Sequence, residues 1–153
     1  MELLKYPNPI LTTPCSPVEK DEIDKDFVQF VYDMDQCRRS MKWGIPVGLA
    51  ANQVGMNARV FIAMGELYIN PEVVWTPKEG LIASKEGCYS LADNEFFYVM
   101  RPYAVKLKWR DLAWREHEKR FNGFEAAVLG HELDHINGLM CNKAATIMSE
   151  KQG

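Results

Sequence analysis

The segment VLGHELDHINGLMC, residues 128 to 141, contains two histidines four residues apart, with a glutamate directly after the first. On an α-helix, His131 and His135 lie on one face, so both imidazoles can bind the same cation. Glu132 is rotated away by one residue, where its carboxylate can exchange a proton with a metal-bound water. The segment therefore predicts a metal-dependent hydrolytic site on a helix, with a third ligand from elsewhere in the chain.

The residues around this motif predict a buried helix over residues 123–136. Asn122 is the expected N-cap, with Glu125 three residues later as in a capping box, and Asn137 with Gly138 is a typical stop signal. A helix that is apolar on more than one face is expected to lie among other elements. This helix is expected to be apolar on two faces. One stripe consists of Phe124, Val128, His131 and His135, and the other of Leu129, Leu133 and Ile136.

The rest of the chain predicts an α+β fold, in which short mixed or antiparallel strands surround the central metal-binding helix. Residues 1–22 contain four prolines and are expected to form an extended arm, and apolar residues at helical spacing predict a helix over about 24–41. Without linkers or repeats, residues 1–153 are expected to form one catalytic domain. The expected strands cover residues 58–64, 67–69, 72–75, 80–84, 96–99, 104–109 and 113–121.

Composition narrows the class of protein. The formal net charge is −3, from 18 basic and 21 acidic residues, so no basic surface for nucleic acid or an anionic membrane is expected. No apolar run has the length of a membrane span, and the N-terminus lacks the pattern of a secretory signal. We therefore expect a cytoplasmic or organelle-matrix protein. Its four cysteines, Cys15, Cys37, Cys88 and Cys141, are expected to be reduced, as buried apolar side chains or as metal ligands.

Three residues compete for the place of the third ligand. Glu150, in the C-terminal tail, would correspond to the distal glutamate of thermolysin-like enzymes. Cys141 stands where the frame HExxHxxGxxH of the metzincin proteases has its third histidine, and Gly138 occupies the glycine position of that frame. Cys88, in KEGCYS (residues 85–90), follows a glycine between two strand signals. The spacing of these residues alone does not choose among them.

A further stretch, PVGLAANQVG (residues 46–55), surrounds Gln53 with small residues that let another chain approach the backbone closely. The Gln53 amide could then donate a hydrogen bond to a developing oxyanion. Taken alone, however, the stretch favours an ordinary loop with the glutamine on the surface.

Together, PVGLAANQ (46–53), EGCYS (86–90) and HELDH (131–135) resemble, in this order, the motifs of the peptide deformylase family. The resemblance extends from Tyr6 to Cys141. It implies that Cys88, His131 and His135 bind the metal, and that Glu132 is the acid/base. It also implies roles for residues outside the ligand set: oxyanion stabilisation by Gln53 and the backbone NH of Tyr89, a peptide cleft lined by Val47, Gly48, Leu49, Gly87 and Val128, and an ion pair between Glu86 and Arg101.

The implied function is removal of the formyl group from N-formylmethionyl polypeptides, with release of formate, by a monomer that holds one divalent ion. Fe²⁺ is the expected native ion, and Zn²⁺ or Ni²⁺ are possible substitutes. Two alternatives remain open: a metzincin-like zinc endopeptidase with Cys141 as ligand, and a structural four-ligand site in a binding protein. Three residues depart from the family pattern: Pro46 replaces a glycine, Tyr89 a leucine, and Gly130 a glutamine.

Overall fold

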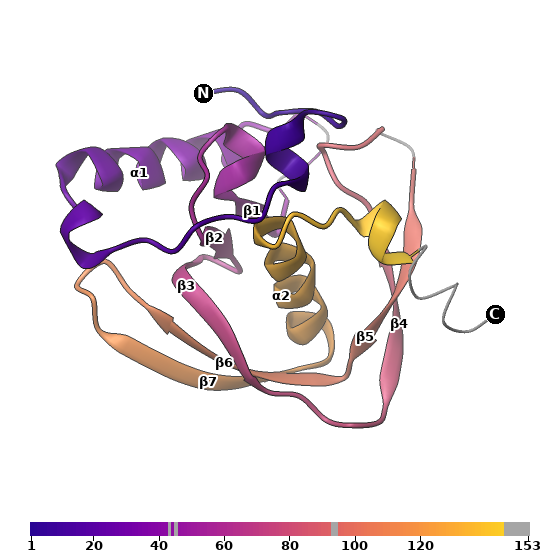
Figure 1. The fold of residues 1–153 in the computed structure, drawn as a ribbon. Helices are drawn as coiled ribbons and strands as arrows, with labels where there is room; N and C mark the ends of the chain where they lie inside the picture. Colours follow the sequence, from indigo (N-terminus) through magenta and orange to yellow (C-terminus); the bar gives the residue numbers. More distant parts are fainter. Residues whose placement is uncertain (43, 45, 93–94, 146–153) are drawn as a thin grey trace.

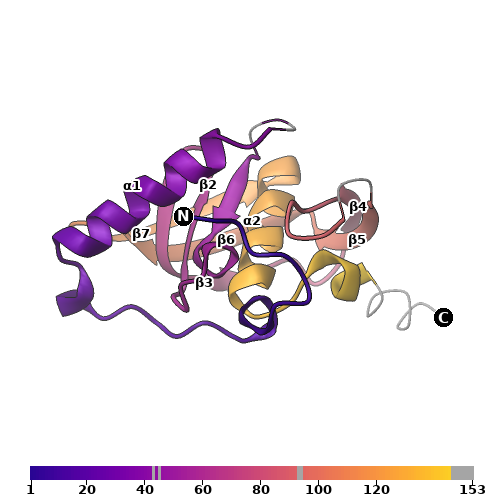
Figure 2. The ribbon, with the colours of Figure 1, turned by 90° about the horizontal axis from the view of Figure 1, so that it is seen from above.

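The motif helix, α2 (Gly123–Ile136), lies in the middle of the fold, between α1 (Lys25–Arg39) on one side and a two-stranded ribbon on the other (Figures 1 and 2). The computed structural model describes residues 1–42, 44, 46–92 and 95–145. The ribbon consists of β4 (Leu81–Glu86) and β5 (Phe97–Pro102). No helix within these residues is long and apolar enough to cross a membrane.

A five-stranded sheet provides the second layer, and all of its pairings are antiparallel. Because β1 stands at the end of the strand order, one of its edges has no neighbouring strand in this sheet. The sheet contains β1 (Gly48–Ala50), β2 (Val60–Ala63), β3 (Glu66–Trp75), β6 (Ala104–Arg110) and β7 (Glu116–Asn122), in the order β1-β2-β3-β6-β7. The predicted α+β class is confirmed.

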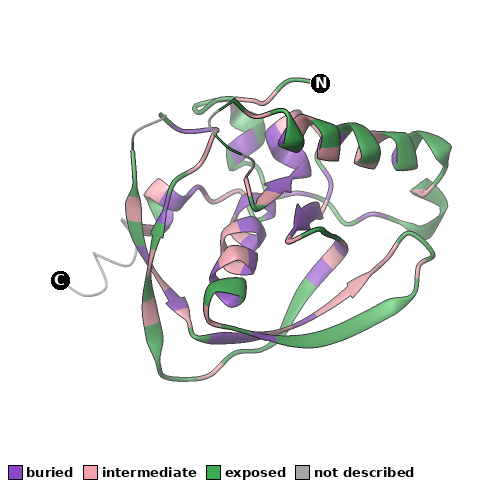
Figure 3. Cartoon of the chain, turned by 180° about the vertical axis from the view of Figure 1, so that it is seen from behind, coloured by how far each residue is buried: buried purple, intermediate pink, exposed green. Residues whose placement is uncertain are grey.

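The core forms on both faces of the first strands of this sheet. Phe61 and Ala63 of β2 pack in one cluster with residues of α2, whereas Val60 and Ile62 pack in another with residues of α1. All four residues of β2 are buried, because side chains alternate between two covered faces. Figure 3 shows the difference between the two helices: α1 is largely exposed, whereas α2 is exposed mainly at its first turn.

Several boundaries differ from those predicted. The predicted strands 67–69 and 72–75 form one strand, β3, because Asn70 is accommodated as an irregularity with a φ of 51°. Its side chain accepts from the Val18 N–H at 2.8 Å and donates to the Val18 carbonyl at 2.7 Å, which supports this conformation. The strand β1 was not predicted at all. The last predicted strand begins later, at Glu116, because residues 111–114 form a turn.

The two helices lie close to their predicted ranges, but the predicted capping box of α2 is wrong. The Asn122 side chain makes no capping hydrogen bond and accepts one from Arg120 Nε at 3.1 Å instead. The helix ends as predicted, where Gly138 adopts a φ of 79°. Phe124, assigned to a buried stripe, is 70% exposed. The N-terminal arm is mostly extended but includes two short 3₁₀ helices, Pro9–Thr12 and Lys20–Glu22.

Candidate metal centre and cleft

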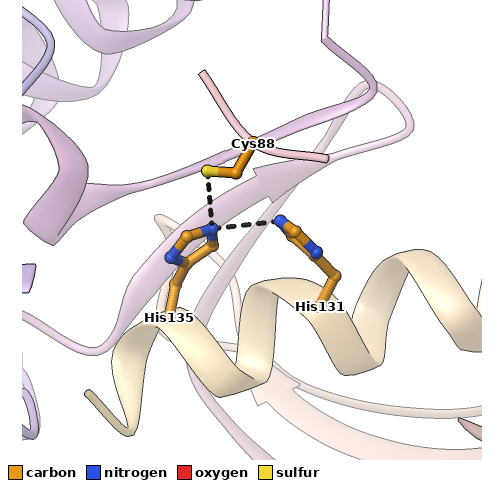
Figure 4. Close-up of side chains that lie close together, drawn as sticks. All are labelled: Cys88, His131 and His135. Atoms are coloured by element: carbon orange, nitrogen blue, oxygen red, sulfur yellow. Dashed lines mark hydrogen bonds between the residues drawn. The ribbon is translucent and has the colours of Figure 1, made fainter. Parts of the chain in front are cut away.

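The side chains of Cys88, His131 and His135 converge on one point, as Figure 4 shows. Their ligand atoms all lie within 4.8 Å of one another. His135 Nε2 is 3.4 Å from Cys88 Sγ and 3.1 Å from His131 Nε2. Tetrahedral ligands at ordinary Zn–N and Zn–S bond lengths are separated by about 3.4–3.6 Å. Two imidazoles and a thiol at these separations fit a divalent ion with an open fourth position.

The elements around the site explain why these atoms meet. His131 and His135 are one turn apart on α2, and Cys88 follows β4 in a turn closed by the Leu91 N–H and the Cys88 carbonyl, 2.9 Å apart. Burial lowers the pKa of His135 well below 6.5, which favours the neutral imidazole that binds metals. Burial would also lower the pKa of His131, but Cys88 and Glu86 raise it to about 10.

The rival third ligands are not part of this cluster. Cys141 is 2% exposed and packs in an apolar cluster with Leu11, Val99 and Met140. Burial raises the pKa of its thiol to about 12, so it remains a neutral apolar side chain. The metzincin-like arrangement is therefore not supported, and the metal-ligating group within the described residues has three members rather than the four of a structural site. Glu150 lies outside the described residues.

An ion-pair network fixes the orientation of the His131 ring through its Nδ1 atom. Glu86 Oε1 lies 2.9 Å from His131 Nδ1, so the imidazole donates there and turns Nε2 toward the cluster. Arg101 donates to both Glu86 oxygens, from Nε at 2.9 Å and Nη2 at 2.7 Å, and from Nη1 to Asp134 Oδ2 at 2.6 Å. Burial would raise the pKa of Glu86, but Arg101 and His131 lower it to about 2. The expected pair of Glu86 and Arg101 is thus present.

Gly130, one of the departures from the family pattern, gives Arg101 its space. A Cβ at Gly130 would lie 3.2 Å from Arg101 Cδ and 3.3 Å from its Nη1. Glycine inside a helix costs about 1 kcal/mol relative to alanine, so the position carries a local cost. In this chain the missing side chain leaves room for Arg101 to cross α2 and form its ion pair with Asp134.

The carboxylate of Glu132 faces the cleft from the same helix. Glu132 is 3% exposed, and its Oε2 has no hydrogen-bond partner among the described residues. Burial raises the pKa of Glu132 to about 7. A carboxyl that titrates near neutrality is suited to accept and return a proton. Gly48 of β1 provides the room: a Cβ there would lie 2.9 Å from both Cδ and Oε1 of Glu132.

Gln53 lies in the short helix η3 (Ala51–Val54), directly after β1, and is 3% exposed. The interpretation of this stretch as a loop with a surface glutamine is therefore wrong. Its Oε1 accepts from the Ala50 N–H at 3.0 Å, which fixes the amide. Its Nε2 donates to Cys88 Sγ at 3.3 Å and to Ser90 Oγ at 3.2 Å, so the amide hydrogens point at the metal-ligand cluster.

Tyr89 directs its backbone N–H away from the turn that contains it. The Cys88 carbonyl accepts from Leu91 inside the turn, and the C=O and N–H of one trans peptide point in opposite directions. The Tyr89 N–H is therefore turned outward. The hydroxyl of Tyr89 donates to the Gly44 carbonyl. The leucine of the family pattern has no hydroxyl, so this hydrogen bond depends on the tyrosine.

The cluster opens into a cleft of about 430 Å³ between β1 and the Cys88 turn. Leu49 is 1% exposed and packs in the α1 cluster, so its contribution to the cleft comes mainly from its backbone. Two aromatic rings, Phe96 at 59% and Phe124 at 70% exposure, stand at the rim. All five residues expected to bind the peptide line this cleft: Val47, Gly48, Leu49, Gly87 and Val128.

Three residues near the ligands were not predicted. Ser90 is 1% exposed and accepts from the Gln53 amide; as the last residue of EGCYS, it could have been found from the motif. Asp134, inside HELDH, accepts from Arg101. Asn52, completely buried, donates to the backbone carbonyl of His135 at 2.6 Å. No sequence signal distinguishes this asparagine, because its partner is a backbone group 83 residues away.

Comparison with known proteins agrees with this geometry. The family described as polypeptide deformylase matches residues 1–150. A peptide deformylase of Thermoanaerobacter pseudethanolicus is 36% identical over 153 residues, covering 97% of this chain and 91% of the relative. That of Leptospira biflexa is 32% identical over 157 residues, covering 91% of this chain and 84% of the relative. The solved structure of the Plasmodium falciparum peptide deformylase superposes with a TM-score of 0.86 at 27% identity, covering 99% of this chain and 93% of that one. The family model matches almost the whole length of this chain, and the fold and the ligand cluster agree with it. The chain therefore belongs to the peptide deformylase family.

Proposed function

We propose that this protein hydrolyses the formyl group from the N-terminal formylmethionine of newly made polypeptides and releases formate. The observation that carries the proposal is a buried carboxylate, Glu132, with an unpartnered oxygen, in the same cleft as a cluster of one thiol and two imidazoles. Hydrolysis of an amide needs an activated water, a proton carrier and oxyanion donors. Side chains of each kind line this cleft or its floor.

Cys88, His131 and His135 would hold one divalent ion. When bound, the ion would lower the pKa of a water and polarise the formyl carbonyl. One soft thiolate and two imidazoles suit Fe²⁺, Zn²⁺ and Ni²⁺, and we propose Fe²⁺ as the native ion, following the family resemblance. The Glu86–Arg101 pair would keep His131 oriented toward that ion.

Glu132 would act as the acid/base. Its carboxylate would accept a proton from the attacking water and then donate it to the departing α-amine of methionine. The raised pKa of Glu132, about 7, supports transfer in both directions at neutral pH. Gln53 Nε2 and the backbone N–H of Tyr89 would donate to the oxyanion that forms when the formyl carbon becomes tetrahedral.

The peptide would lie in an extended conformation beside β1, along the edge that has no neighbouring strand in the sheet, where Val47 and Gly48 line the cleft. Gly87 would face it from the other wall, and the apolar side chains of Val47 and Val128 would contact the methionine. We further propose that the protein acts as a cytoplasmic monomer with one catalytic domain over residues 1–153. The net charge of −3 supports the absence of direct nucleic-acid binding.

Formate release from a short formyl-Met peptide tests this proposal, with protein prepared anaerobically and loaded with Fe²⁺ or Ni²⁺. Cys88→Ser should lose the metal and the activity, whereas Glu132→Gln should keep the metal and lose activity by about 10³-fold or more. Cys141→Ala is the matched control, because this cysteine lies outside the cluster, and it should retain activity. Loss of activity in Cys141→Ala with Cys88→Ser still active would contradict the assignment, as would the absence of formate with either metal.

A further inference from the structure

Three consecutive residues of the N-terminal arm bind the backbone of both segments that carry the proposed oxyanion donors. The Leu4 N–H donates to the Gln53 carbonyl at 2.7 Å, and the Tyr6 N–H donates to the Ser90 carbonyl at 2.8 Å. Between them, the Lys5 ammonium donates to the Tyr89 carbonyl. We propose that Leu4, Lys5 and Tyr6 form a brace that positions the Gln53 amide relative to the Tyr89 N–H, and that this brace supports catalysis rather than substrate binding.

The two donors need such a connection because they belong to different parts of the fold. Gln53 follows β1 of the five-stranded sheet, whereas Tyr89 follows β4 of the separate two-stranded ribbon. Donors to an oxyanion must be held at a set separation before the reaction, since a displacement of about 1 Å can cost about 100-fold in rate. A movement of the ribbon against the sheet would change this separation directly.

The side-chain contacts that also join the two segments cannot serve this purpose throughout the reaction. They run from Gln53 Nε2 to Cys88 Sγ and Ser90 Oγ, and so they use the same amide hydrogens that would turn to the oxyanion. The brace instead engages the carbonyls of Gln53, Tyr89 and Ser90, which the proposed reaction leaves untouched. Its bonds can therefore persist while the amide hydrogens are in use.

The spacing along the brace gives it a defined length. Leu4 and Tyr6 are two residues apart, a separation of about 7 Å in extended chain. The arm is also fixed beyond this point, where it reaches the end of α2 (indigo arm in Figure 1). The Cys15 N–H donates to the Ile136 carbonyl at 2.8 Å, and a Cβ on Gly138 would lie 2.9 Å from the Thr12 carbonyl. One segment thus joins the oxyanion donors to the helix that carries two of the metal ligands.

The inference rests on the proposed function, so its test separates the two. Leu4→Pro removes one backbone donor of the brace, and Lys5→Met removes the ammonium while keeping the aliphatic stem. Each change should lower kcat by about tenfold for the formyl-Met peptide, with KM and the visible spectrum of the Co²⁺-loaded protein unchanged. Lys5→Arg should restore most of the loss. Lys20→Met, the same loss of charge elsewhere in the arm, should leave kcat unchanged.

A double-mutant cycle decides whether the brace acts through the donors. If it does, the effect of Leu4→Pro should shrink from about tenfold to less than about threefold in a Gln53→Ala background. Effects that multiply independently, or kcat values of Leu4→Pro and Lys5→Met close to that of the wild type, would overturn the brace. If Gln53→Ala itself leaves kcat unchanged, the oxyanion role within the proposed function fails instead. Should Leu4→Pro fail to fold, the same cycle with Lys5→Met gives the answer.

Discussion

Replacing Arg101 by methionine is expected to destabilise the protein strongly and to weaken metal binding. Arg101 is 6% exposed and donates three hydrogen bonds to two carboxylates, those of Glu86 and Asp134. Methionine would leave Asp134 without its cation and Glu86 with only the His131 imidazole as partner, in a largely buried environment. Removing one partner of a buried ion pair costs about 3–5 kcal/mol, and we expect about 4 kcal/mol of the free energy of unfolding here.

The same change should loosen His131. Glu86 would lose the cation that fixes it, and the hydrogen bond from His131 Nδ1 to Glu86 orients a proposed metal ligand. Changes in such supporting groups lower metal affinity by about 10- to 100-fold. Competition of the folded protein with a calibrated chelator for Co²⁺ would measure this loss independently of stability.

Urea unfolding of the metal-free protein measures the stability, and Arg38→Met is the matched control. With a slope of about 2 kcal/mol per molar urea, the midpoint of Arg101→Met should fall by about 2 M. Arg38 is similarly buried at 8%, but its carboxylate partner Asp35 is 26% exposed and keeps Arg39 as a second cation. Its replacement should cost about 1–2 kcal/mol. Equal losses in the two variants, or a loss below about 1 kcal/mol for Arg101→Met, would refute the reasoning.

Three further changes test other contacts. Gly48→Ala should displace the Glu132 carboxylate, because the new Cβ would lie 2.9 Å from it. We expect kcat to fall about 100-fold while the metal content stays unchanged, and a kcat within threefold of that of the wild type would contradict this. The pKa of Glu86 is lowered from 4.5 to about 2 in the folded protein, so its stabilisation is complete above about pH 4.5 and is lost as the pH falls toward 2. Urea midpoints of wild type should therefore fall more steeply than those of Glu86→Gln between pH 6 and pH 3, and parallel curves would argue against it. Asn52→Ala should cost about 1 kcal/mol in the same unfolding assay, because the His135 carbonyl loses the amide donor and keeps the Gly138 N–H as its other donor; no measurable change would contradict a stabilising role of this hydrogen bond.

The motif helix, α2, shows which structural features a local sequence pattern can predict. The spacing of His131 and His135 predicted both the helix and their common face, since a helix repeats every 3.6 residues. The end at Ile136 followed from Asn137 and Gly138, whose backbone conformation is a local matter. The capping box failed because the Asn122 side chain is engaged by Arg120, a competition that the spacing of polar residues does not reveal.

The spacing of residues alone left the third ligand open. Cys88 and Cys141 both fit a plausible spacing, and the resemblance to a family favoured Cys88. In the fold, the chain turns at Gly138 and carries Cys141 into an apolar cluster, whereas the turn after β4 brings Cys88 to the histidines. The burial of Gln53 was likewise not predictable from its small neighbours, because segments distant in sequence cover it.

By itself, the sequence determined the helix with its two histidines and Glu132, the presence of several short strands, and a composition without a basic surface. These are properties of neighbouring residues, and periodicity, turn residues and charge report them directly. The tertiary structure places Cys88 beside the two histidines, as the family resemblance implied, and it alone showed that Arg101 crosses Gly130 to reach Asp134 and that the N-terminal arm joins Gln53 to Ser90. Such contacts link residues far apart in sequence, often through backbone groups that every residue possesses, so they arise when the elements pack together and leave no local pattern in the chain.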